Sequence, residues 1–187
     1  MYARVVDFGG KYTWQYDKVE RQVCSLIAVL LRHGFRVKFD NDMEQPRNAC
    51  GAVASLAAAL LSEVDWKHAD MSLAAHSNII SNAVSSWLNL GVRAEDECPD
   101  LSADHVAALY QFFKIVRTAG TRTRRCYNVD SFSVVAWDGL CEKLWRLVTH
   151  SKVTADPWHE VCVCNTDHSG MQGSHWFAVA FSIEPSL

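Results

Sequence analysis

The segment from Gly51 to Ser62 places the strongest constraint on the fold, because it combines a helical composition with almost no polar side chains. It reads GAVASLAAALLS, so alanine and leucine fall on every side of a helix drawn through it. A helix that is apolar all round has to be covered by other elements on most of its sides. The segment therefore predicts a buried helix and a fold with enough surrounding structure to enclose it.

The whole chain has the size and composition to provide that enclosure. With 187 residues, of which 49% are hydrophobic and 21% charged, it can bury one sizeable core, and we expect a single domain spanning residues 1–187. The net charge of −3 gives no reason to expect a nucleic-acid partner or an anionic membrane.

Targeting signals are not apparent in the sequence. No apolar run approaches the roughly 20 residues of a membrane span, and the first residues lack a signal-peptide pattern. We expect a soluble, intracellular protein of the cytoplasm or nucleus, with no membrane partner. Delivery into another cell and the oligomeric state are left open by the sequence.

The remaining hydrophobic patterns predict a mixture of helices and strands. Runs of β-branched and aromatic residues predict strands over residues 2–8, 35–39, 160–164 and 175–183. Helical spacing of apolar residues predicts helices over residues 14–33, 65–89, 102–116 and 140–148, and residues 132–137 fit either a strand or a helix start. The fold class expected is α+β, with a central mixed or antiparallel sheet packed against the buried helix.

Cys50 directly precedes the apolar helix and is the first candidate for chemistry. Unpaired N–H groups and the positive end of the helix dipole favour a thiolate at such a position, and the thiolate is the reactive form of cysteine. Gln45 lies five residues upstream in an irregular loop. Its amide can donate to an oxyanion that forms when Cys50 attacks a carbonyl group.

A thiolate nucleophile needs an imidazole partner, and the best candidate is His175 at the far end of the chain. His175 follows the turn Gly170 to Ser174 and opens an apolar strand. A cysteine peptidase uses such an imidazole to protonate the leaving amine. Taken alone, a cysteine in an apolar helix is usually a small buried residue, so the pairing of Cys50 with His175 rests on the two flanking patterns together.

The other cysteines do not indicate a disulfide framework or a metal site. Seven scattered cysteines suit reduced thiols better than paired ones. Cys162 and Cys164, with His159 and His168 nearby, form the one zinc candidate. We disfavour it, because it lacks the C-x2-C pairs of usual structural zinc sites. No metal and no cofactor are expected.

Two segments resemble a known family of enzymes. The sequence from Gln45 to Gly51, QPRNACG, is similar to the Gln-Pro-Asn-x-x-Asp-Cys-Gly signature of the adenovirus-protease and Ulp/SENP-type, ubiquitin-like-specific cysteine peptidases. Ser174 to Val179 resembles the family's His-Trp-x-Leu-x-Val strand, and residues 86–89, SWLN, resemble its Trp-Leu-Asn-Asp segment. The chain departs from the signature at Ala49, where the family has an acidic residue.

The order of these segments differs from the family, which places the histidine before the cysteine. A circular permutation accounts for the difference, because joining Leu187 to Met1 places Asp7 about where the family has its triad acid. The resemblance thus implies a circularly permuted papain-like fold with catalytic residues Cys50, His175, Asp7 and Gln45. Asn165 and Asp167, on or after the preceding strand, stay open as alternatives to Asp7.

The resemblance also implies a function. The family consists of thiol proteases that cleave ubiquitin-like proteins from conjugates or process viral precursors, so it implies a hydrolase of peptide or isopeptide bonds with a protein substrate, in the ubiquitin-like conjugation pathway. Two alternatives remain: an acyltransferase using the same Cys–His site, and a catalytically inactive module that binds a ubiquitin-like partner. Substrate identity and source are beyond the sequence.

Overall fold

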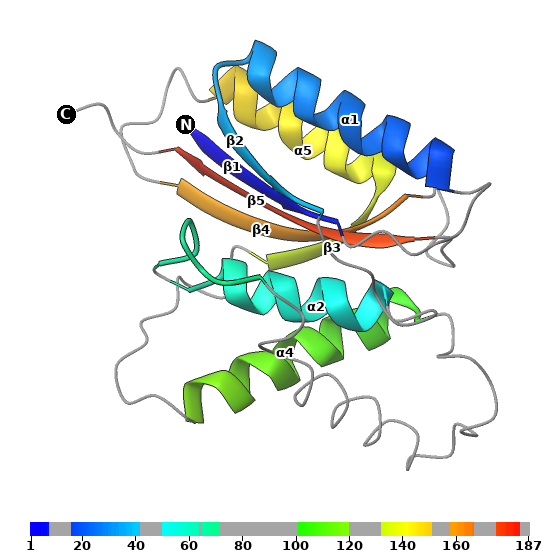
Figure 1. Ribbon diagram of the computed structural model, residues 1–187, viewed down its shortest axis with the longest axis vertical. Coiled ribbons are helices and arrows are strands. Elements are labelled where there is room, and N and C mark those ends of the chain that lie inside the picture. Colours follow the sequence, from blue (N-terminus) through cyan, green and yellow to red (C-terminus); the bar gives the residue numbers. More distant parts are fainter. Residues whose placement is uncertain are drawn as a thin grey trace.

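The computed structural model describes residues 1–7, 16–41, 50–63, 65–71, 101–119, 132–150, 158–166 and 175–183. Within these ranges the chain forms a five-stranded mixed sheet with helices on both faces (Figure 1). This confirms the α+β class. The elements are β1 (Tyr2–Val6), α1 (Tyr16–Arg32), β2 (Arg36–Asp40), α2 (Cys50–Leu61), α4 (Ala103–Ala119), β3 (Phe132–Ala136), α5 (Trp137–His150), β4 (Trp158–Asn165) and β5 (Trp176–Ile183).

The strand order brings the two ends of the chain together. The order is β2-β1-β5-β4-β3, with β5 antiparallel to both of its neighbours and with β1–β2 and β3–β4 parallel. In register, Val6 pairs with Ala178 and Asn165 with Trp176. The ends of β1 and β4 therefore meet the start of β5 at one end of the sheet, which we call the site end.

Side chains alternate between the two faces of the sheet and build two cores. On β5, Trp176, Ala178 and Ala180 lie in the cluster that contains α2, whereas Phe177, Val179 and Phe181 lie in the cluster with α1 and α5. This alternation is the two-residue period of a strand buried on both faces. The sheet is thus the middle layer, with α2 and α4 on one side and α1 and α5 on the other (Figure 1).

The burial expected for the Ala/Leu-rich helix is confirmed. All residues of α2 after Cys50 are buried, between the sheet and the apolar side of α4. That side consists of Val106, Leu109, Tyr110 and Phe113. The small alanine side chains leave room for close packing on both sides. Cys50, at the first position of α2, is consequently carried on a helix held by two layers.

The other face has conventional amphipathic helices. Leu26 and Leu30 of α1 and Leu140 and Leu144 of α5 are buried against the odd-numbered residues of β5. The spacing of four residues within each pair is one that is expected of a helix with one apolar stripe. These helices hold the sheet from behind, on the face away from Cys50.

Two sequence expectations need adjustment. Residues 132–136 are a strand, and α5 begins at Trp137, before the predicted start at residue 140, with the Trp137 ring 6.4 Å from that of Phe177. Residues 65–68, predicted as the start of a helix, form a turn in which the His68 N–H bonds to the Asp65 carbonyl. Residues 69–71 are not helical either, and the remainder of that predicted helix, residues 72–89, lies outside the described residues.

Gly51 provides a first testable prediction, because a side chain there has no space. A Cβ atom at this position would lie 2.9 Å from Cδ1 and 3.1 Å from Cβ of Leu101. We expect Gly51→Ala to destabilise the fold by about 1–2 kcal/mol, since overpacking outweighs the gain of up to about 1 kcal/mol in helix propensity. Urea unfolding measures this. The double variant with Leu101→Ala should cost less than the sum of the two single changes, and strict additivity would contradict the clash.

Candidate active site

An acid and an imidazole meet at the site end of the sheet. Asp7 is the residue after β1, and His175 is the residue before β5. Because β1 and β5 are antiparallel neighbours, the end of one lies beside the start of the other. His175 Nε2 donates to Asp7 Oδ1 at 2.5 Å, and both residues are buried, with 8% and 4% of their surfaces exposed. The contact joins residues 168 positions apart.

Cys50 completes the group from the helix side. As the first residue of α2, it lies where that helix reaches the site end, and its side chain is close enough to the His175 imidazole to raise the pKa of that ring. Since Asp7 occupies Nε2, the other ring nitrogen, Nδ1, is the one left to face the sulfur. Cys50 is partly exposed, whereas His175 and Asp7 are buried behind it. Cys50 is therefore the member of this group that is open to a substrate.

The surroundings of His175 favour its protonated form. Burial alone lowers the pKa of this imidazole, but the hydrogen bond to Asp7, the neighbouring Cys50 side chain and the negative charge of Asp7 raise the pKa to about 10. At neutral pH the ring is therefore a cation held between a carboxylate and a sulfur. A cation beside a sulfur at a helix N-terminus is an environment in which reactive thiolates occur.

The backbone of His175 is held by Thr166, which is itself bonded to α1. The Thr166 N–H, just after β4, donates to the His175 carbonyl at 3.0 Å. The Thr166 carbonyl in turn accepts from Nε2 of Gln22 on α1 at 3.0 Å. The helix layer on the far face of the sheet thus supports the imidazole. Neither Gln22 nor Thr166 could be predicted from the sequence, because a polar residue on a helix or after a strand carries no signal of its distant partner.

Of the four residues expected at the site, three come together. Asp7, Cys50 and His175 form the group, while Gln45 lies outside the described residues. Asn165 and Asp167 were the alternatives to Asp7. Asn165 is fully buried at the end of β4, opposite Trp176, and Asp167 lies outside the described residues. The carboxylate that contacts the imidazole belongs to Asp7.

The former zinc candidate is divided by the sheet. Cys162 and Cys164 belong to the core of α1 and α5, where burial raises the pKa of Cys162 to about 12 and raises that of Cys164 as well. His159 faces the other side and contacts the Leu61 carbonyl at the end of α2. His168 lies outside the described residues. In the part of the chain that the structure describes, no three potential metal ligands are grouped together.

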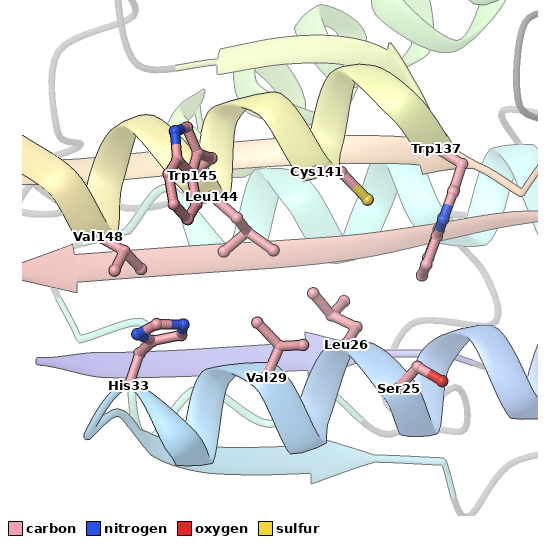
Figure 2. A pocket seen from close by; sticks show the side chains of 9 residues that line it. All are labelled: Ser25, Leu26, Val29, His33, Trp137, Cys141, Leu144, Trp145 and Val148. Carbon is pink, nitrogen blue, oxygen red and sulfur yellow. The ribbon is translucent and has the colours of Figure 1, made fainter.

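A groove of about 330 Å³ lies between α1 and α5 (Figure 2). Its lining is mostly apolar and includes Leu26, Val29, Leu144 and Trp145, and 67% of the Trp145 surface is exposed. Both helices cover the face of the sheet opposite α2. The groove is therefore separated from the Cys50 sulfur by the sheet itself.

Comparisons of the chain with protein-family models, with curated proteins and with solved structures give no match. None of the described helices combines the length and the apolar character needed to cross a membrane. The fold defines an α+β protein with a mixed sheet, and the group formed by Cys50, His175 and Asp7 is its candidate site.

Proposed function

We propose that this protein is a cysteine peptidase or isopeptidase, with Cys50 as nucleophile, His175 as acid and base, and Asp7 as the residue that orients the imidazole. One observation carries the proposal: a hydrogen-bonded, buried carboxylate–imidazole pair lies beside a partly exposed cysteine at the start of a buried helix. Thiol hydrolases use this arrangement, in which a nucleophile lies beside a base and the base is oriented by a third group.

The reaction follows from the charges of the group. The Cys50 thiolate attacks the carbonyl carbon of a peptide or isopeptide bond, forming a C–S bond and an oxyanion. His175, protonated at neutral pH, donates its proton to the leaving amine as the C–N bond breaks, and a thioester remains. Neutral His175 then takes a proton from water, which attacks the thioester and releases the acid. The proposed oxyanion donors are the Cys50 backbone N–H and the Gln45 amide.

The finer fold assignment is also a proposal: a circularly permuted papain-like fold of the adenovirus-protease and Ulp/SENP type. Two features support it. β1 and β5, close to the two ends of the chain, are antiparallel neighbours in the sheet, which is the relation a permutation requires. The helix that carries the cysteine packs against the same sheet and is buried. The substrates implied by the resemblance are ubiquitin-like conjugates.

A competition between thiols tests the activation of Cys50. With limiting iodoacetamide near neutral pH, we expect Cys50 to be alkylated before Cys24 and Cys141, although those two are more exposed. Partial burial, followed by the charge of Asp138, raises the pKa of Cys141, which slows its reaction further. Peptide mapping by mass spectrometry gives the order of labelling, and His175→Ala should remove the advantage of Cys50. Alkylation of the most exposed cysteines first, with Cys50 after Cys24 and Cys141, would contradict the proposal.

Ubiquitin-like probes and isopeptide substrates test which kind of bond the protein cleaves. Ubiquitin and ubiquitin-like proteins carrying an electrophile at the C-terminus should form a covalent adduct with Cys50, and none with Cys50→Ala. Turnover of the matching isopeptide without added acyl-CoA separates hydrolysis from acyl transfer. Noncovalent binding of the probe by a protein that forms no adduct would support the inactive binding module instead.

A further inference from the structure

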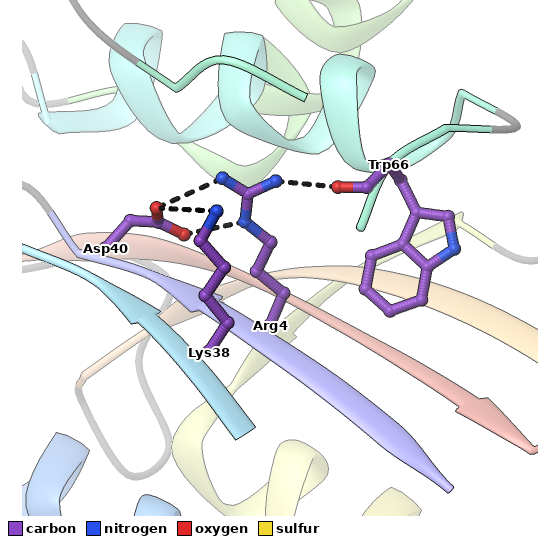
Figure 3. A network of polar contacts seen from close by, with 4 residues as sticks. All are labelled: Arg4, Lys38, Asp40 and Trp66. Atoms are coloured by element: carbon purple, nitrogen blue, oxygen red, sulfur yellow. Dashed lines mark hydrogen bonds and ion pairs between the residues drawn. The ribbon is translucent and has the colours of Figure 1, made fainter. Parts of the chain in front are cut away.

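A partly buried ion pair lies next to the site, between β1, β2 and the segment after α2. Arg4, only 1% exposed, donates from Nε to Asp40 Oδ2 at 2.6 Å and from Nη2 to Asp40 Oδ1 at 3.0 Å (Figure 3). Its third nitrogen, Nη1, donates to the Trp66 carbonyl at 2.7 Å. A two-pronged contact between guanidinium and carboxylate fixes orientation as well as distance. Asp40 is therefore held in one position relative to β1.

Asp40 in turn holds the backbone of Asp7. It is the last residue of β2, which has a described strand on one side only. Its carbonyl accepts the Asp7 N–H at 3.0 Å, one step beyond the final register pair of the two strands, Val6 and Asp40. A continuous series of contacts thus runs from the Arg4 guanidinium through Asp40 to the backbone of Asp7. The carboxylate at its end is the one that contacts His175.

The same guanidinium also connects the sheet with the helix that carries Cys50. Trp66 follows α2 and packs its ring against Tyr2 on β1 and His159 on β4, with ring centroids 5.3 and 4.8 Å apart. Arg4 bonds to the carbonyl of this residue. Lys38 also lies beside Asp40, with its ammonium 3.8 Å away on a side chain that is 44% exposed, so water screens its charge.

We infer that Arg4 and Asp40 are positioning residues, which set the place of Asp7 and thereby the strength of its contact with His175. This inference rests on the proposed function. Neither residue is a catalytic residue, because neither touches His175, Cys50 or a reacting atom. Their effect is transmitted by the bidentate contact and by the backbone hydrogen bond between Asp40 and Asp7.

The test follows the titration of His175 by NMR in the intact protein, with His175→Gln used to assign its signal. Asp40→Asn weakens the contact with Arg4, so that Asp7 is held less firmly in place. We expect the His175 titration midpoint to fall by about one pH unit, the lower end of the pKa shift that a neighbouring carboxylate causes. The loss of the negative charge of Asp40 would by itself also lower this midpoint. The double variant Arg4→Met with Asp40→Asn removes one positive and one negative charge. If the His175 midpoint still falls in the double variant, the cause is the position of Asp7 and not the change in net charge.

Two further variants complete the comparison. Glu160→Gln breaks the ion pair of Glu160 with Lys143, which lies away from the site end, and should leave the His175 midpoint unchanged. Arg4→Lys keeps the charge and loses the two-pronged contact, so it should shift the midpoint without leaving a buried charge unpaired. This milder change carries the test if Asp40→Asn does not fold.

The outcomes separate the inference from the proposed function. A wild-type midpoint well above 6.5, with a shift in Arg4→Lys and in the double variant but not in Glu160→Gln, supports the positioning role. If the His175 midpoint in the double variant and in Arg4→Lys equals that of the wild type, the positioning role is overturned. The proposed function is unaffected by that result. A wild-type midpoint near the ordinary 6.5 would overturn the Asp7–His175–Cys50 arrangement, and this inference with it.

Discussion

Cys50→Ala is expected to lower hydrolysis of a peptide or isopeptide substrate by about 10⁴-fold or more, because the variant has no atom that can form the thioester. The neighbouring imidazole and carboxylate should remain in place, since Cys50 is partly exposed and its truncation leaves the buried side of α2 untouched. The measurement is kcat/KM on the isopeptide substrate, alongside an unfolding curve to show that the variant is folded.

The chain offers two matched controls for this change. Cys24 on α1 and Cys141 on α5 are both exposed, and both helices lie on the face of the sheet opposite α2. Cys24→Ala and Cys141→Ala should retain wild-type activity. An active Cys50→Ala protein, or equal losses in the three variants, would show that the thiol of Cys50 is not the nucleophile.

The buried His175–Asp7 pair is expected to make stability fall as the pH rises. The folded-state pKa of His175, about 10, is above its ordinary value of 6.5, so the folded protein holds this proton more tightly than the unfolded chain does. The stabilisation is complete below pH 6.5, declines above it and is lost by about pH 10. It amounts to about 3–5 kcal/mol, from 1.36 kcal/mol per unit of pKa difference.

Urea unfolding at a series of pH values measures this loss of stability, and the pH range used decides which residue the result reports. Burial also raises the pKa values of Cys162 and Cys164, which makes the protein lose stability at higher pH. Those losses begin only above about pH 8.5, the ordinary pKa of a thiol. A decline between pH 6.5 and about 8.5 therefore reports His175. Asp7→Asn should flatten most of it, Glu160→Gln should leave it unchanged, and a flat wild-type profile would contradict the pairing.

Local sequence patterns predicted much of the fold. The strands near both termini and the helices α1, α2 and α4 lie within a few residues of the predicted ranges, because alternation and helical spacing express which side of an element is buried. The burial of α2 followed from its composition, since no arrangement of alanine and leucine on all sides leaves a polar face for water. The candidate pair of Cys50 and His175 also came from local context and a family resemblance.

The supporting contacts of the site had no such signal. Arg4 lies in a short strand and Asp40 at the end of another, and nothing in either segment indicates a bidentate contact between them. Likewise, the bond from Gln22 to the Thr166 carbonyl joins residues 144 positions apart. Such contacts depend on which strands become neighbours, a property of the assembled sheet and not of any one strand.

By itself, the amino-acid sequence determined that this chain contains an enclosed apolar helix with a cysteine at its start, because the hydrophobic effect acts on each segment's own side chains. Only the tertiary structure decided that β5 lies between β1 and β4, and so that Asp7 is the carboxylate which contacts His175. Strand neighbours are selected by backbone hydrogen bonds and by packing on both faces, and these forces exist only once distant segments meet.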